Sequence, residues 1–104
     1  MYANAYDIRQ ATEADAVALD RLAALDSQRP LSGPVLVAEI GGSPAAAISL
    51  TEDRVVADPF QYTAVARRGL RMRADALRAY ERTPSLAERI REALAPFRAR
   101  TRGA

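Results

Sequence analysis

The sequence predicts a small α+β domain built on a mainly antiparallel sheet of about four strands. Two observations support this fold class. Short apolar segments between residues 35 and 57 are separated by turns too brief to hold a helix, which favours antiparallel pairing. Apolar residues recur at helical spacing before and after these segments. The chain has 104 residues, enough for one domain core.

The N-terminal part predicts one strand and one capped helix. Residues 6–9 form a short candidate strand. Asp15 stands three residues after Thr12, which is the spacing of a capping box at the start of a helix. Helical spacing then predicts a helix from about residue 13 to residue 26, with an apolar stripe formed by Ala14, Ala18, Leu22 and Leu25. The Pro, Ser and Gly content predicts a loop up to residue 34.

The middle of the chain predicts a three-stranded meander. Residues 35–40 are apolar and partly β-branched, and the turn at residues 41–43 leads to a second arm at residues 45–50. Pro44 can begin that arm but is not expected in the centre of a strand. Residues 54–57 form the third arm.

A long Arg-rich helix is predicted from residue 62 to residue 82. Each residue of a helix is rotated by about 100° from the one before it. This rotation places apolar or small residues on one half of the helix surface: Tyr62, Val65, Ala66, Gly69, Leu70, Met72, Ala76, Leu77 and Tyr80. The other half carries Arg67, Arg68, Arg71, Asp75, Arg78 and Arg82. Arg73 lies near the middle of the apolar half. It either pairs with a sheet acid such as Glu39 or Asp58, marks a subunit interface, or extends its head to water.

The chain divides into a domain at residues 1–83 and a C-terminal segment at residues 84–104. Ser85 and Glu88 have capping-box spacing, and a short helix followed by a frayed basic tail is expected. Its apolar stripe either folds back on the domain or forms a seam for a partner helix: Leu86, Ile90, Leu94 and Phe97.

The composition excludes several classes of chemistry. The chain contains no Cys and no His. Thiol nucleophiles, zinc sites of Cys and His, and Ser-His-Asp triads are therefore impossible within it, and we expect no metal site. No apolar stretch is long enough for a transmembrane helix, and the N-terminus lacks an apolar leader region, so a cytoplasmic protein is expected.

The charge is distributed unevenly along the chain. Residues 1–60 carry four Arg and nine acidic residues, whereas residues 61–104 carry eleven Arg and four acidic residues. This asymmetry indicates either an anionic partner or complementary charges within one fold or between two copies. No aromatic residue interleaves the Arg residues of helix 62–82 for base stacking, so a nucleic-acid partner is not expected.

Two stretches resemble the first half of a GNAT (GCN5-related) N-acetyltransferase, over roughly residues 5–58. They are Ile8-Arg9-Gln10-Ala11-Thr12-Glu13-Ala14-Asp15, similar to the family's opening, and residues 35–46, which look like its hairpin of second and third strands. The resemblance implies an acetyl-CoA site after the fourth strand. It also implies Glu39, on a sheet strand, as a candidate general base.

The cofactor motif of the family is not matched in this chain. The motif is Gln/Arg-x-x-Gly-x-Gly/Ala at the start of a helix, where backbone N–H groups hold the pyrophosphate. Here Gly69 follows Ala66 by three residues, precedes Arg71 by two, and lies inside the predicted helix. We expect no bound cofactor. If acetyl-CoA binds, the candidate residues are Arg67, Arg68, Gly69 and Arg71.

A sheet that stops at residues 55–57 leaves an open edge, which a helix must cover or a second copy must pair with. The candidate interface residues are Val55, Val56, Met72, Arg73 and Tyr80.

The sequence therefore predicts a non-catalytic, truncated GNAT-like module that acts through a homodimer or a protein partner. One alternative is an acetyl-CoA-dependent N-acetyltransferase with a degenerate or dimer-completed site. Another is nucleic-acid binding through the Arg face of helix 62–82.

Overall fold

The fold is α+β, as predicted, in a computed structural model that describes residues 5–82, 88–91 and 93. Most boundaries lie within two residues of those expected. The strand predicted at residues 6–9 is shifted by one residue, and the long helix begins two residues later than predicted. The elements are β1 (Asp7–Gln10), a 3-10 turn η1 (Glu13–Asp15), α1 (Ala16–Leu25), β2 (Val35–Ile40), β3 (Ser43–Ser49), β4 (Val55–Ala57) and α2 (Ala64–Arg82).

The four strands form one antiparallel sheet in the order β1-β2-β3-β4. The register between β2 and β3 shifts at Ala38 and Glu39, where Pro44 lies opposite Glu39. Proline has no N–H to donate to a neighbouring strand, so its place beside a bulge near the strand start agrees with the expected restriction.

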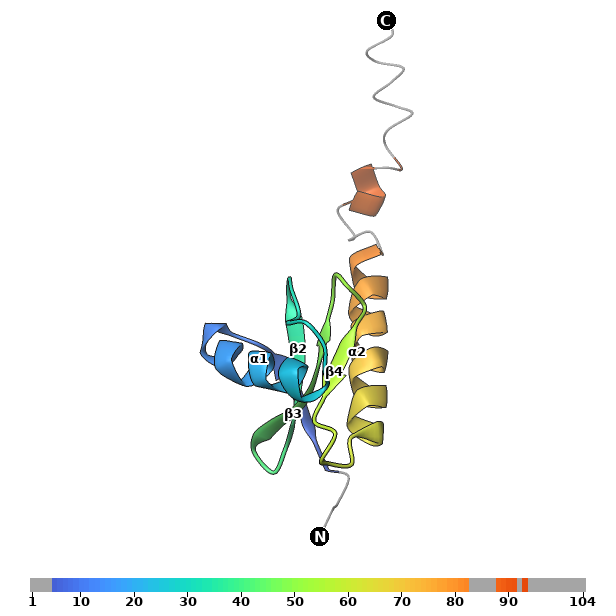
Figure 1. Ribbon diagram of the computed structural model, residues 1–104. Helices are drawn as coiled ribbons and strands as arrows, with labels where there is room; N and C mark the ends of the chain where they lie inside the picture. Colours follow the sequence, from blue (N-terminus) through green and yellow to red (C-terminus); the bar gives the residue numbers. More distant parts are fainter. Residues whose placement is uncertain (1–4, 83–87, 92, 94–104) are drawn as a thin grey trace, which may run out of the picture.

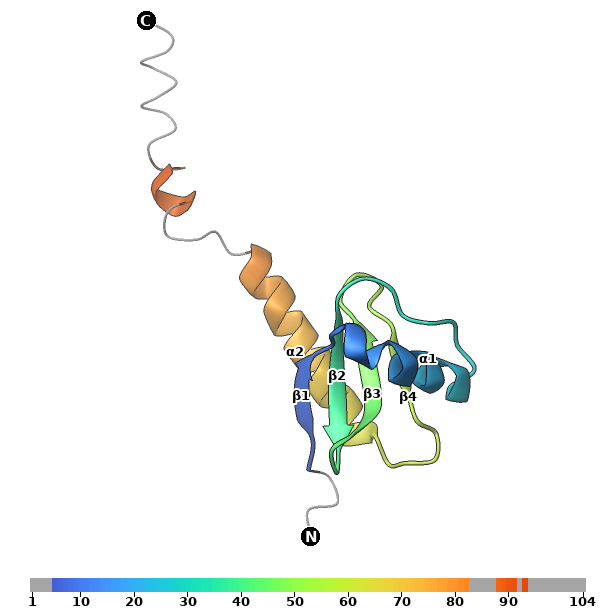
Figure 2. The same cartoon turned by 90° about the vertical axis from the view of Figure 1, so that its left-hand side faces the viewer.

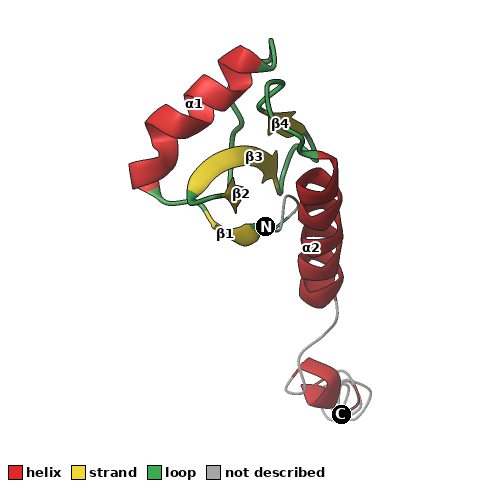
Figure 3. Ribbon diagram, turned by 90° about the horizontal axis from the view of Figure 1, so that it is seen from below, coloured by secondary structure: helices red, strands yellow, loops and turns green. Residues whose placement is uncertain are grey.

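The two helices cover opposite faces of the sheet, with α1 on one side and α2 on the other (Figures 1 and 3). Successive residues of a strand point to opposite faces, so β2 and β3 supply buried side chains to both layers. The cluster under α1 consists of Leu22, Ala23, Val35, Val37, Ala47 and Val56. The cluster under α2 consists of Leu36, Ala38, Ala46, Ile48, Ala57, Ala66, Leu70 and Ala74.

The sheet contacts a different face of α2 from the one predicted. The predicted apolar half is centred near Arg73, and the buried face is rotated away from it. The buried stripe consists of Ala66, Leu70 and Ala74, because alanines let the helix backbone approach the sheet closely. Arg78, predicted on the polar half, is only half-exposed, and its Nη2 donates to the Leu50 carbonyl at 3.0 Å. Met72, Ala76 and Tyr80 of the predicted apolar half are therefore left exposed.

The predicted C-terminal helix is only partly described. Residues 88–91 and 93 are helical, whereas Leu86, Leu94 and Phe97 lie outside the described residues. No helix in the described ranges has both the length and the apolar character that a membrane crossing requires.

Candidate functional site

The β4 edge of the sheet is closed by two side chains from the end of α1. Gln28 Nε2 donates to the Val55 carbonyl at 3.0 Å, and the Ala57 N–H donates to Asp26 Oδ2 at 3.1 Å. Gln28 Nε2 also donates to Asp26 Oδ2 at 2.8 Å, which links the two side chains. Within the described chain, side chains at and just after the C-cap of α1 cover part of this edge, whereas its pairing with a second copy stays a prediction. Val56, a candidate interface residue, is 0% exposed in the core below α1.

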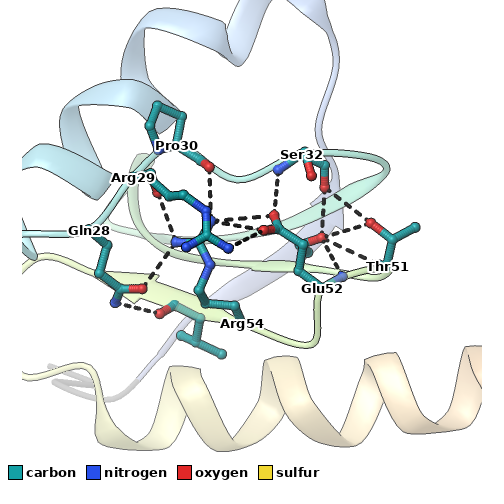
Figure 4. A network of polar contacts seen from close by, with 9 residues as sticks. Gln28, Arg29, Pro30, Ser32, Thr51, Glu52 and Arg54 are labelled. Carbon is teal, nitrogen blue, oxygen red and sulfur yellow. Dashed lines mark hydrogen bonds and ion pairs between the residues drawn. The ribbon is translucent and has the colours of Figure 1, made fainter.

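Arg54 holds the loop between α1 and β2 in place (Figure 4). Its Nη1 donates to Gln28 Oε1 at 3.1 Å and to the Arg29 carbonyl at 2.8 Å. Its Nη2 donates to the Pro30 carbonyl at 2.9 Å and to Glu52 Oε1 at 3.2 Å. One guanidinium thus fixes three successive loop residues against the turn between β3 and β4.

Two further contacts fasten the same loop to that turn. The Ser32 N–H donates to Glu52 Oε2 at 2.7 Å, and Ser49 Oγ donates to the Ser32 carbonyl at 2.7 Å. The Ser32 N–H, followed by Arg54, lowers the pKa of the Glu52 carboxyl from 4.5 to about 2. Glu52 therefore acts as a charged structural anchor at neutral pH.

The β1 edge is open among the described residues, because no described strand lies beyond it. The Ala11 N–H donates to the Val35 carbonyl, so odd-numbered residues of this segment bond to β2. Backbone groups alternate in an antiparallel strand, and those of Ile8 and Gln10 therefore point away from the sheet. The Gln10 carbonyl accepts a hydrogen bond from Arg9 Nη1 at 3.3 Å.

A stripe of α2, exposed except at Gly69, lies on the β1 side of the sheet (Figure 2). We call it the α2 flank: Gly69, Met72, Arg73, Ala76 and Tyr80. Met72 is 67% exposed and Tyr80 is 79% exposed. An open groove of about 460 Å³ joins the flank to β1 and is lined by Tyr6, Asp7, Ile8, Gly69, Met72, Arg73 and Ala76. Figure 2 shows α2 crossing behind the sheet and extending past its β1 side. We refer to β1 and the α2 flank together as the β1–α2 surface.

The structure separates the candidate interface residues into two groups. Met72, Arg73 and Tyr80 share the α2 flank, whereas Val55 and Val56 lie on β4. Of the three alternatives for Arg73, an ion pair with a sheet acid is not found in the described part of the chain. Among the described contacts, Arg73 has no ion pair and its side chain is exposed.

Gly69 has a packing role that the sequence did not indicate. The ring and hydroxyl of Tyr6 lie where a Cβ of residue 69 would be. Gly69 is also inside α2, one turn beyond its start at Ala64. Its missing side chain therefore makes room for Tyr6, and the helix N-terminus that a phosphate cradle requires lies elsewhere.

Glu39, the candidate base, is part of an ion-pair cluster on the α1 side. Arg9 Nε donates to Glu39 Oε1 at 3.2 Å, and the other two nitrogens of Arg9 donate to the two oxygens of Asp15 at 2.8 and 2.7 Å. Arg9, followed by the Thr12 N–H, lowers the pKa of Asp15, and Asp15 raises the pKa of Arg9. The Thr12 N–H donates to Asp15 Oδ2 at 2.7 Å, which is one half of the predicted capping box.

Two of the candidate cofactor residues lie together near the start of α2. Arg67 and Arg71 line a cavity of about 420 Å³, which also includes Asp26, Asp58 and Thr63. Neither arginine makes an ion pair with another described residue. Arg68 does not line this cavity, and Gly69 faces Tyr6 instead.

Asp58 in this cavity is already bonded within the chain. Gln61 Nε2 donates to its Oδ2 at 2.9 Å, and the Phe60 N–H donates to its Oδ1 at 2.9 Å. These two donors lower the pKa of the Asp58 carboxyl. The cavity therefore holds two unpaired arginines beside carboxylates that already have donors.

A scan against protein-family models, a search of curated proteins and a search of solved structures each found no significant match to this chain.

Proposed function

We propose that the chain is a non-catalytic interaction module that docks a protein partner on its β1–α2 surface. An extended segment adds to the open β1 edge by main-chain hydrogen bonds, and its side chains or a following helix pack on the α2 flank. The resemblance to the first half of a GNAT domain remains a prediction, and the proposal does not depend on it.

The observation that supports this function is the contrast between the two sheet edges. At the β4 edge, the outward Val55 C=O and Ala57 N–H are bonded by Gln28 and Asp26. At the β1 edge, no described hydrogen bond reaches the outward groups of Ile8, which shares an open groove with the exposed Met72. Unpaired backbone groups next to large apolar and aromatic side chains are features of a docking surface.

The positions of the enzyme candidates also favour a docking role. The Glu39 carboxylate forms an ion pair with Arg9, so it already has a structural contact within the chain. Gly69 is covered by Tyr6, so its backbone is not available to a phosphate group. Both candidates therefore already take part in structural contacts of the fold.

Site-specific photo-cross-linking in cells that express the chain tests the proposal. A photoreactive amino acid replaces Met72 on the α2 flank or, as the matched control, Val17, which is 83% exposed on α1 at the opposite face. We expect a discrete cross-linked band from position 72 and none from position 17. Equal labelling at both positions, or no band at position 72, would contradict the proposal.

Acetyl-CoA binding is a second candidate, favoured by the unpaired Arg67 and Arg71 around one cavity near the start of α2. Calorimetric titration of CoA and acetyl-CoA tests it. Binding tighter than about 100 µM that is lost in the Arg67→Ala/Arg71→Ala double variant, and kept in Arg68→Ala, would move this function ahead. No heat with millimolar ligand would remove it.

A further inference from the structure

We infer that the occupant of the β1–α2 surface is a second copy of this chain, whose β1 pairs antiparallel with β1 across a two-fold axis at Ile8. This inference rests on the proposed docking function and names its partner. The axis stands perpendicular to the sheet, so two four-stranded sheets join into one and both α2 helices lie on the same side.

The direction of the backbone groups limits where such an axis can pass. In an antiparallel pair, a residue whose N–H and C=O face the neighbouring strand lies opposite another residue of the same kind. The outward groups of β1 belong to Ile8 and Gln10, and the inward ones to Asp7 and Arg9. A symmetric pair therefore has one of these residues opposite itself, and an axis between two residues is excluded.

The charges on β1 select one of these registers. An axis at Asp7 or at Arg9 would place two like charges directly opposite each other, which is unfavourable. An axis at Gln10 would place Arg9 opposite Ala11 and leave Asp7 beyond the pairing. An axis at Ile8 places Asp7 of each copy opposite Arg9 of the other, so two pairs of opposite charge form.

The side chains of Asp7 and Arg9 are able to make these pairs. Asp7 is exposed and has no ion pair within the described part of the chain. Arg9 has five N–H groups, and its described hydrogen bonds to Glu39, Asp15 and Gln10 use four of them. One Nη2 N–H of Arg9 is left for Asp7 of the second copy.

The face of the sheet under α2 supplies the apolar part of the same interface. Ile8 packs toward the α2 cluster and is only half-buried, so the two Ile8 side chains meet on that face. The α2 flanks of the two copies then approach each other over the joined β1 strands. Exposed Met72 and Tyr80 side chains are of the types that anchor protein interfaces.

Single cysteines test the register directly, because the natural chain contains no Cys. Ile8→Cys places two thiols in a directly opposed pair whose Cα atoms lie about 5.5 Å apart, within reach of a disulfide. Gln10→Cys is the matched control on the same edge, where the two Cα atoms are separated by roughly 13 Å along the strands. Mild oxidation should join the Ile8→Cys chains into covalent dimers and leave the Gln10→Cys chains mostly monomeric.

A second test uses charge and avoids any change to the core. Light scattering of the unmodified chain should give twice its mass of 11.3 kDa at concentrations of tens to hundreds of micromolar. Asp7→Arg should weaken the dimer at least about tenfold in Kd, because two attractive pairs become repulsive. Glu13→Arg, the same charge change at an exposed residue of η1, should leave the Kd unchanged.

Each result has a defined meaning. A monomeric mass up to about 0.5 mM would overturn the second copy as occupant, while a position-72 cross-link to another protein would keep the proposed docking function. A dimer that cross-links through Gln10→Cys and not Ile8→Cys, or that ignores Asp7→Arg, would overturn the register. A monomer without any position-72 cross-link would overturn both proposals.

Discussion

The two edges of the sheet differ in how their backbone groups are satisfied. At β4, the end of α1 supplies an amide and a carboxylate that bond the outward C=O of Val55 and N–H of Ala57. At β1, the outward groups of Ile8 and Gln10 face away from every described strand. The contrast shows that two polar side chains at the end of a helix can bond outward backbone groups that would otherwise pair with another strand.

The closure of β4 depends on how α1 ends. The Gln28 N–H donates to the Ala23 carbonyl at 2.8 Å and the Ser27 N–H donates to the Ala24 carbonyl at 3.1 Å, which is the pattern of a Schellman motif. Ser27 adopts the left-handed conformation that this motif requires, with φ of 53°. The turn directs Asp26 and Gln28 onto β4, whereas no helix end among the described residues bonds to the outward groups of β1.

Replacement of Arg54 should have the largest effect on the closed edge. Arg54→Met leaves the carbonyls of Arg29 and Pro30 and the Glu52 carboxylate without their shared donor. Loss of one partner from a largely buried charged network costs about 3 kcal/mol of unfolding free energy. Urea unfolding measures this loss. Arg68→Met, at an exposed arginine without such contacts, should change the unfolding free energy by less than about 0.5 kcal/mol.

The same network should make stability fall in acid. The folded pKa of Glu52, about 2, lies below its ordinary value of 4.5. Its contribution is therefore complete above pH 4.5 and is lost as the pH falls toward 2. Thermal unfolding between pH 6 and pH 3 should show a smaller decrease in Tm for Glu52→Gln than for the natural chain. Glu13→Gln, at an exposed carboxyl, should retain the natural slope, and an unchanged slope in Glu52→Gln would contradict this role.

Opening the β4 edge should make the two edges alike. Asp26→Ala leaves the Ala57 N–H unpaired and removes one contact of Gln28, at a cost of about 1–2 kcal/mol in unfolding free energy. The newly exposed edge should also promote assemblies larger than the natural chain forms, measured by sedimentation velocity. Asp20→Ala, at an exposed carboxyl on α1, should do neither. If Asp26→Ala stays at the natural assembly size, the capping side chains are not what keeps this edge unpaired.

The sequence predicted the fold from periodicity, and the structure bears this out where the pattern is local. The apolar runs of β2 and β3 and the capping spacing of Thr12 and Asp15 all depend on residues a few positions apart. The orientation of α2 was not predictable in this way. Its apolar half is wider than the strip a sheet can cover, so the sequence did not show which part stays exposed.

The polar contacts of the site also could not be predicted from sequence patterns. Arg9 and Glu39 are 30 residues apart, and Arg54 and Arg29 are 25 residues apart, so no local spacing relates them. Asp26 and Gln28 belong to a segment whose composition predicts only a loop. The interface candidates on α2 were chosen because the charged Arg73 interrupts the apolar half of the helix, and their interface role stays a prediction. The open β1 edge follows from the strand order, which the sequence did not show.

The smallest predicted effect concerns the contact between β1 and the α2 flank. Glycine inside a helix is about 1 kcal/mol less favourable than alanine, so Gly69→Ala would stabilise α2 if the position were open. Tyr6 occupies the place of the added methyl group, so we expect this gain to be cancelled or reversed in the natural chain. In a Tyr6→Ala background, Gly69→Ala should recover a gain of up to about 1 kcal/mol.

The four unfolding free energies of this double-mutant cycle give the coupling between Tyr6 and Gly69. A coupling free energy close to zero would mean that Tyr6 does not pack against α2. Tyr6 would then not line the groove between β1 and the α2 flank. A coupling of about 1 kcal/mol would show that the first residues before β1 are held against α2. The β1 edge would then be a fixed surface, ordered before any partner strand arrives, in the same way that the Arg54 network fixes the closed edge at β4.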